Sequence, residues 1–497
     1  MTITAPTVPA RVAGLVAELD AVRGVWIGGT GRAATDGTTF AVDDPATGES
    51  IAAVADAGTP EAVAAVDSAA AALPGWAATP ARTRGEALRR AYELMVADTE
   101  RLAALIAWEN GKALPDARAE VAYAAEFFRW FAEEAVRTDG EYGPSPAGGT
   151  RTVVTHVPVG VAALVTPWNF PAAMATRKIA PALAAGCTVV LKPASETPLT
   201  ALAVARILTA AGVADGVVNV VPTSSSSTVV TSWLEDPRVR KISFTGSTPV
   251  GRILLRQAAD RIVNSSMELG GNAPFVVCED ADLGAAVRGA MVAKFRNAGQ
   301  ACTAANRFYV HADVADEFVA RFGAAIEALR VGSAFADRTE IGPLVSSKAR
   351  AGVAALVDEA TAGGAAVTHQ ARVPSGDRGW FYPPTLLTGV DAGAAILRNE
   401  VFGPVAPVVT WTSEDEMLRW VNDTEFGLAA YVYSGSLQRA MRIAESVEAG
   451  MVGVNRGIVS DPSTPFGGVK QSGLGREGAR EGLREFQETK YLSVEWT

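Results

Sequence analysis

The chain has 497 residues, of which 48% are hydrophobic and 20% charged, enough for about two to four domains or one large α/β unit. Its net charge of −10 and its lack of Lys/Arg runs argue against a nucleic-acid surface or a polybasic membrane anchor. We therefore expect its partners to be small molecules or copies of itself, with no nucleic acid and no membrane.

The N-terminal segment predicts an amphipathic helix, because its apolar residues recur at three- and four-residue spacing between Val12 and Val22. It lacks the cationic start and continuous apolar core of a signal peptide. The longest apolar run, residues 157–165, is too short to span a bilayer. These features predict a cytoplasmic protein.

Residues 60–137 are Ala-rich with helical spacing, and Gly111 is expected to end one of the helices. The pattern then changes to short β-branched runs joined by helices. The expected strands are 151–157, 160–167, 188–193, 216–222 and 239–246. Such alternation predicts a parallel, doubly wound sheet with ligands at the carboxyl ends of its strands.

A second α/β set follows, so we expect two Rossmann-like lobes. Its strands are expected at 273–277, 306–310, 404–411, 428–434 and 450–455. The tail, 490–497, predicts a terminal strand. We expect this strand and the strand at 151–157 each to have an uncovered edge. Because such edges are usually paired, they predict a homodimer or homotetramer.

The cysteines and histidines do not follow the spacing of metal sites. They form no CxxC, HxxxH or HExxH pattern: Cys187, Cys278, Cys302, His156, His311 and His369. We therefore expect neither a protein-bound metal nor a disulfide framework.

Two loops after strands are candidates for binding a nucleotide. In residues 240–254 a strand leads to Gly246, the hydroxyl residue Ser247 and a helix whose first N–H groups can accept a phosphate, although an ordinary capped helix explains the pattern equally well. Lys192 ends the strand of "TVVLKPASETP", where a cation suits a ribose hydroxyl or a phosphate, with the Ser195 hydroxyl nearby. A surface lysine is the alternative.

Two further residues suit acyl chemistry. Asn169 of "TPWNFP" can donate its amide to an oxyanion, or cap an Asx turn. Glu268 of "SMELGG" lies between apolar residues, where a raised pKa would suit a general base; a solvated or salt-bridged carboxylate is the alternative.

Cys302 lies among polar and glycine residues in "FRNAGQACTAAN", whereas Cys187 and Cys278 have the apolar neighbours of structural cysteines. A nucleophilic cysteine needs a base or an electropositive setting, and no histidine lies in a comparable motif. A Cys-His hydrolase is therefore disfavoured, and Glu268 is the candidate base.

Eight motifs in order resemble the aldehyde dehydrogenase superfamily over nearly the whole chain. They are "TPWNFP", "LKPASETP", "FTGS", "ELGGNAP", "FRNAGQAC", "NEVFGPV", "NDTEFGLAAYVYS" and "PFGGVKQSGLGREG". The resemblance implies a coenzyme domain (1–140 and 159–270), a catalytic domain (271–470), and a small β oligomerisation arm with the C-terminal tail (141–158 and 471–497).

The resemblance also implies roles for individual residues. Cys302 would form a thiohemiacetal and then a thioester, Asn169 would hold the oxyanion, and Glu268 would activate the hydrolytic water. NAD or NADP would be bound by Thr166, Pro167, Trp168, Lys192, Ser195, Gly246, Ser247, Glu400 and Phe402.

Within the superfamily, "KFRNAGQ", "NDTEFGLAAY" and "GIVSDPSTPFGG" are most similar to succinate-semialdehyde dehydrogenases. That similarity implies a substrate carboxylate bound by Arg177, Arg296 and Ser460, consistent with the donors that arginine supplies. Another semialdehyde, such as glutarate semialdehyde, or an aliphatic aldehyde remains open. A cofactor-independent thiol esterase and a catalytically silent protein are alternatives from other classes.

Four positions depart from the superfamily pattern. Ala304 replaces a second cysteine, and the serines at 224–227 replace glycines near the expected adenine site. Arg456 faces either the pocket or the surface. Glu196, next to Ser195, would repel a 2′-phosphate, which leaves NAD versus NADP open.

Overall fold

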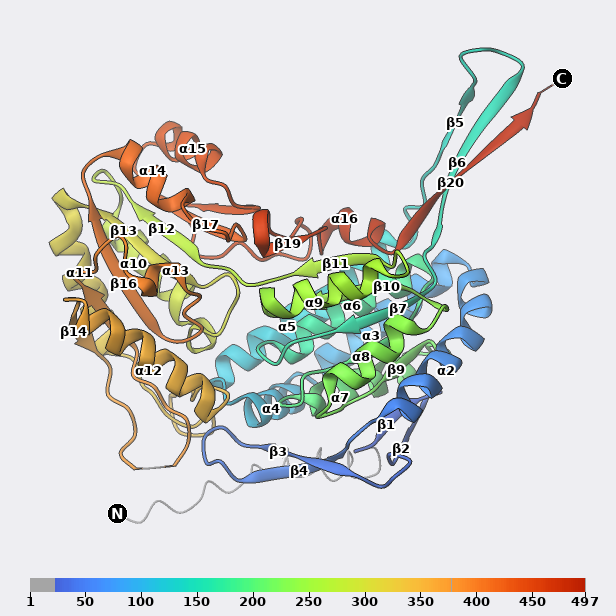
Figure 1. Ribbon diagram of the computed structural model, residues 1–497, viewed down its shortest axis with the longest axis horizontal. Helices are drawn as coiled ribbons and strands as arrows, with labels where there is room; N and C mark the ends of the chain where they lie inside the picture. Colours follow the sequence, from blue (N-terminus) through green and yellow to red (C-terminus); the bar gives the residue numbers. More distant parts are fainter. Residues whose placement is uncertain (1–22, 377, 497) are drawn as a thin grey trace.

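The computed structural model describes residues 23–376 and 378–496, so the helix expected between positions 12 and 22 lies outside the described residues. Two large sheets with helices around them and a projecting three-stranded arm form an α/β protein (Figure 1). None of the helices in the described ranges is both long and apolar enough to cross a membrane.

The helical stretch expected at 60–137 is confirmed. It consists of α2 (Thr59–Ala78), α3 (Ala81–Ala97), α4 (Thr99–Asn110) and α5 (Leu114–Glu134). Gly111 ends α4 in the left-handed conformation, with φ of 87°, which a glycine adopts without steric cost.

The first sheet has eight strands in the order β19-β11-β10-β7-β8-β9-β1-β2. Its parallel strands are β7 (Val161–Val165), β8 (Thr188–Lys192), β9 (Val218–Val220), β10 (Val239–Thr245) and β11 (Asn264–Glu268). Two strands run antiparallel to their neighbours in this set, β1 (Val25–Ile27) beside β9 and β19 (Gly473–Leu474) beside β11, and β2 (Thr30–Arg32) pairs antiparallel with β1. The helices between them are α6 (Pro171–Ala185), α7 (Pro198–Ala210), α8 (Ser226–Glu235) and α9 (Thr248–Ala259). A separate hairpin joins β3 (Thr39–Asp43) and β4 (Ser50–Ala55).

Both faces of the first sheet are covered, as its fully buried strands β7, β8 and β9 require. Ala162 and Leu164 of β7 belong to one apolar core, which includes residues of α3 to α7. Val161, Ala163 and Val165 point the other way and join a second core with residues of α2, α8 and α9. The alternation of side chains along a strand therefore places helices on both faces.

The second sheet has seven strands in the order β14-β15-β16-β13-β12-β17-β18. They are β12 (Ala273–Val277), β13 (Ala305–His311), β14 (Ala366–Gln370), β15 (Thr385–Thr388), β16 (Val405–Trp411), β17 (Ala429–Tyr433) and β18 (Met451–Val454), and only β14 is antiparallel among them. Its helices include α10 (Leu283–Phe295), α11 (Ala312–Glu327), α12 (Ser347–Ala362), α14 (Glu414–Asn422) and α15 (Leu437–Ser446).

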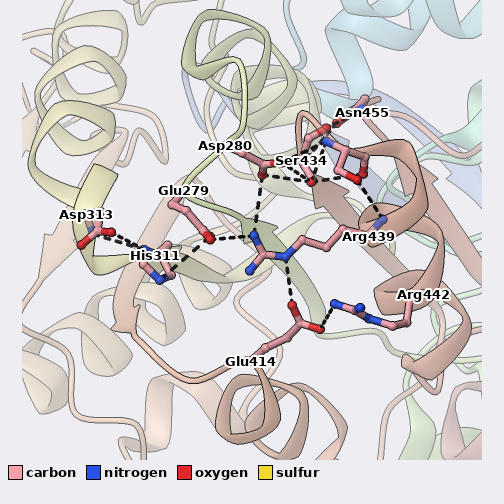
Figure 2. Close-up of polar contacts among 10 residues, drawn as sticks. Glu279, Asp280, His311, Asp313, Glu414, Ser434, Arg439, Arg442 and Asn455 are labelled. Atoms are coloured by element: carbon pink, nitrogen blue, oxygen red, sulfur yellow. Dashed lines mark hydrogen bonds and ion pairs between the residues drawn. The ribbon is translucent and has the colours of Figure 1, made fainter.

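Charged and polar side chains contact one another near the carboxyl ends of the second sheet's strands, as Figure 2 shows. Arg439 lies 2.8 Å from Glu279, which follows β12, and 2.9 Å from Glu414 at the start of α14. Cys302 instead precedes β13, at the amino end of the sheet. Cys302 and this charged cluster therefore lie at opposite ends of the second sheet.

The arm contains β5 (Glu141–Pro144), β6 (Thr150–Pro158) and β20 (Gln487–Glu495), in the order β20-β6-β5 (Figure 1). The expectation of an uncovered edge at 151–157 was wrong, because β6 is the central strand and pairs on both sides. Of the C-terminal segment, only β20 joins the arm; β19 pairs with β11 in the first sheet.

Candidate active site

A cavity of about 250 Å³ is lined by residues from both lobes. The predicted site residues that line it are Pro167, Trp168, Asn169, Arg177, Gly246, Ser247, Arg296, Cys302, Glu400, Phe402 and Ser460. Thr166, Lys192, Ser195 and Glu268 are not among its lining residues. The tertiary structure thus brings together side chains that lie up to 293 positions apart in the sequence, Pro167 and Ser460.

Cys302 follows a tight left-handed turn and is partly exposed, whereas Cys187 and Cys278 are buried. Asn297 and Ala298 have φ of 53° and 54°, values that cost non-glycine residues conformational energy. A Cβ on Gly271 would lie 2.2 Å from the carbonyl oxygen of Cys302, so only glycine fits beside this turn. Burial raises the pKa of the Cys302 thiol to about 12, opposed by the nearby cation of Arg177.

Asn169 is held through both its side chain and its main chain. Its amide Nδ2 donates to the Gln300 carbonyl oxygen at 3.1 Å. Its main-chain oxygen accepts from Lys112 Nζ and from Asn297 Nδ2, each at 2.8 Å. These contacts fix Asn169 against the segment that carries Cys302, as an oxyanion donor requires.

Glu268 ends β11 in an almost fully buried position. Burial raises the pKa of Glu268 well above its usual value, and the neighbouring Glu477 carboxylate raises it further, while Lys178 and Arg177 oppose the shift. Its buried Oε2 has no hydrogen-bond partner among the described residues. Such an acid can exchange a proton with a bound water or substrate.

Arg177 and Arg296 have different surroundings. Arg177 is buried; its guanidinium carbon lies 4.0 Å from the centre of the Phe466 ring, and its Nη1 lies 3.5 Å from Glu477. Arg296 lies over Phe170 at 5.3 Å and forms no ion pair with a carboxylate in the described part of the chain. Arg456 is exposed and does not line the cavity, so the structure favours its surface alternative.

Lys192 lies at the end of β8, where its buried ammonium donates to the Ser226 hydroxyl at 3.0 Å. Burial lowers the pKa of Lys192 to about 8, although Glu196 acts in the opposite direction. Ser195 donates to Glu196 at 3.1 Å. Among the described residues, the hydrogen-bond partner of this buried ammonium is a neutral hydroxyl, which leaves Lys192 suited to a ribose or phosphate of a bound nucleotide.

The remaining loops of the first lobe also fit a dinucleotide. The Ser247 side chain does not cap α9, so the first N–H groups of that helix remain available for an anion. A Cβ on Gly246 would lie 2.4 Å from the Phe244 ring, which requires glycine there. Trp168 and Phe402 are in edge contact at 5.4 Å. Glu400 accepts from the Gly271 N–H at 3.1 Å, and its burial raises its pKa to about 7.

Several contacting residues were not predicted. Tyr123, Phe170, Met174 and Phe466 line the cavity, but their aromatic and apolar character alone gives no functional signal. Glu477 accepts from Lys178 at 2.5 Å, and it lies in the motif "SGLGREG" without an expected role. The serines at 224–227 contact residues distant in the sequence: Ser224 N–H donates to Asp56 at 2.8 Å, and Ser226 accepts from Lys192.

Known proteins are similar to this chain over most of its length. The sequence model of the Aldehyde dehydrogenase family matches residues 32–492. A succinate-semialdehyde dehydrogenase from Paenarthrobacter nicotinovorans is 53% identical over 429 residues, 86% of this chain and 95% of that protein. A glutarate-semialdehyde dehydrogenase from Pseudomonas putida is 46% identical over 469 residues, which cover 94% of this chain and 97% of that protein. A crystal structure of an NADP-dependent enzyme from E. coli superposes with a TM-score of 0.94 at 45% identity, covering 96% of this chain and 98% of that one.

Proposed function

Because the chain belongs to the aldehyde dehydrogenase family, we propose that it oxidises a carboxylate-bearing aldehyde, succinate semialdehyde, to the dicarboxylic acid. The observation that carries the choice of substrate is the presence of two arginines in the cavity that also holds Cys302. Arg296 forms no ion pair in the described part of the chain, although it interacts electrostatically with the buried carboxyl of Asp116, so a substrate carboxylate would supply an ion-pair partner.

Cys302 is the proposed nucleophile. Its sulfur attacks the aldehyde carbon, and the oxygen that becomes negative accepts hydrogen bonds from the Asn169 amide and the Cys302 N–H. Because burial raises the pKa of Cys302 to about 12, the thiol must give its proton to a base as the sulfur–carbon bond forms, and Glu268 is the candidate acceptor. Arg177 lowers that pKa in part and thereby favours the thiolate.

Glu268 is the proposed general base. Its buried oxygen without a partner is suited to take the proton of the water that hydrolyses the thioester on Cys302. Lys178 and Arg177 favour the ionised form of this carboxyl and so oppose the rise in its pKa that burial and Glu477 produce.

NAD or NADP is the proposed coenzyme, with Lys192 and Ser195 on the adenosine ribose, Gly246 and Ser247 on the pyrophosphate, and Glu400 on the nicotinamide ribose. Thr166, Pro167, Trp168 and Phe402 complete the proposed contacts. When bound, the coenzyme accepts the hydride from the aldehyde carbon. The similarity to an NADP-dependent enzyme supports NADP, while the Glu196 carboxylate beside Ser195 supports NAD.

The proposed assembly is a homodimer or homotetramer formed through the arm. The support is its exposed apolar side chains, which include Tyr142, Tyr491 and Trp496. Large exposed apolar residues gathered on one projecting element are typical of protein interfaces.

An assay grid tests the proposal: succinate semialdehyde, glutarate semialdehyde and butanal, each with NAD and with NADP. Two charge-assisted hydrogen bonds predict a kcat/KM for succinate semialdehyde at least about tenfold above that for butanal. Higher activity with glutarate semialdehyde would favour that alternative, which the relative from Pseudomonas putida supports. Equal values for butanal and succinate semialdehyde would contradict the carboxylate site. Fast ester hydrolysis without coenzyme, together with inert aldehydes, would instead indicate a thiol esterase.

A further inference from the structure

Tyr123 is a polar residue of the cavity that has no role in the mechanism above. It belongs to α5, is partly exposed, and lines the cavity together with Arg177 and Cys302. Its hydroxyl forms a hydrogen bond with Nη2 of Arg177, and the guanidinium carbon lies 5.6 Å from the centre of its ring. The neighbouring Phe127 contacts the ring edge-on at 5.0 Å, which fixes the direction of the tyrosine.

The chemistry of this hydrogen bond leaves one proton without a partner. A guanidinium has donors only, so the Tyr123 oxygen must accept from Arg177. The phenolic hydrogen of Tyr123 therefore points elsewhere, and no second partner for this hydroxyl is found in the described part of the chain. A donor that lines a cavity without an acceptor is suited to a ligand that brings one.

Arg177 also has unused hydrogen-bonding capacity. Its Nε is buried and has no acceptor among the described residues. Its Nη1 lies 3.5 Å from one oxygen of Glu477, and Lys178 donates to the other oxygen. The aromatic ring of Phe466 covers the guanidinium at 4.0 Å and limits its access to water. Donors thus exceed acceptors around Tyr123, and a carboxylate has several lone pairs to offer.

We propose that Tyr123 is a specificity-determining residue: its oxygen accepts from Arg177 while its hydroxyl hydrogen is donated to the substrate carboxylate. The inference rests on the proposed function and extends it, because it adds a donor to Arg177, Arg296 and Ser460. The Tyr123 hydroxyl also positions the guanidinium of Arg177. Without it, Nη2 of Arg177 would lose its only hydrogen-bond acceptor in the described chain, and Glu477 would be the remaining partner for the guanidinium.

Tyr123→Phe removes only the hydroxyl and tests the proposal. We expect KM for succinate semialdehyde to rise on the order of 10- to 100-fold, the effect of one hydrogen bond to a charged group, with kcat nearly unchanged. KM for butanal, which has no carboxylate, should stay within about twofold of wild type. Tyr92→Phe is the matched control, because it removes a tyrosine hydroxyl from a residue that does not line this cavity.

A second measurement needs no coenzyme. Succinate should protect Cys302 of the wild-type protein from alkylation by iodoacetamide, and the concentration that protects half of the thiol should rise by the same factor in Tyr123→Phe. Butyramide, the neutral analogue, should protect both proteins alike. This readout separates ligand binding from the chemical steps.

The outcomes separate the two proposals. If the wild-type enzyme prefers succinate semialdehyde over butanal and Tyr123→Phe keeps that preference in full, the role of Tyr123 is overturned and the proposed function stands. If Tyr123→Phe lowers kcat/KM equally for succinate semialdehyde and for butanal, Tyr123 is only structural and the inference is again overturned. If the wild-type enzyme shows no preference for the carboxylated aldehyde, both proposals fail.

Discussion

Lys112 Nζ lies 2.8 Å from the main-chain oxygen of Asn169 and 2.5 Å from the carboxylate of Glu120, in a fully buried contact. Glu120 also accepts from the N–H of Ala172 at 2.8 Å, in the first turn of α6. One ion pair therefore fixes both the oxyanion donor and the start of the helix that carries Arg177.

Glu120→Gln should destabilise the fold. The amide keeps an oxygen for the α6 N–H groups but removes the ion-pair partner of the buried Lys112 and leaves the longer-range attraction of Asp116, a change that costs about 3–5 kcal/mol. Chemical denaturation should report this loss of unfolding free energy. Glu317→Gln, which breaks an exposed pair with Arg321 on α11, is the control and should change it little. Equal losses for the two variants would contradict the predicted importance of burial.

Arg296→Ala should lower kcat/KM for succinate semialdehyde by about 30-fold or more and affect butanal far less, because truncating one partner of a buried charged contact costs about 2–5 kcal/mol. Arg456→Ala is the matched control, since Arg456 is exposed and lies outside the cavity lining. Steady-state kinetics with both aldehydes measure the difference. A comparable decrease in kcat/KM for the Arg456 variant would mean that the effect arises from long-range electrostatics and not from direct contact with the substrate.

NADPH binding should weaken as the pH rises from 7 to 9. Burial lowers the pKa of Lys192 to about 8, so the ammonium is mostly charged at pH 7 and mostly neutral at pH 9. The dissociation constant should therefore rise about tenfold, whereas that of NADH, which lacks the 2′-phosphate, should change less. Fluorescence titration of the free protein measures both constants. Lys192→Met should remove the pH dependence and the exposed Lys348→Met should keep it; a persistent dependence in the first variant would point to another group.

Alkylation of Cys302 by iodoacetamide should accelerate about tenfold for each pH unit between 7 and 9, because the reactive thiolate is a minor species below its raised pKa. Arg177→Ala should slow the reaction at every pH, since removing the cation raises that pKa further. Mass spectrometry of the labelled peptide follows the rate, and Cys302→Ala provides the background from Cys187 and Cys278. A rate that does not depend on pH would show that the thiol is already ionised.

Much of the fold follows from local patterns. The switch from helical spacing before residue 140 to β-branched runs after 150 marks the boundary between the helices α2 to α5 and the first strands. Local patterns could not show that β6 is a central strand, because pairing with β20 joins segments more than 300 residues apart.

By itself the sequence determined that Cys302 differs from the other two cysteines, because its polar, glycine-containing frame belongs to a loop and not to a core. Only the tertiary structure decided what surrounds this thiol. Packing between helices and strands distant in the chain produces the hydrogen bond between Arg177 and Tyr123. The same packing places Glu477 beside Glu268. Burial then sets the pKa values of these groups, and burial depends on the assembled fold, since no short stretch of sequence can exclude water from a side chain alone.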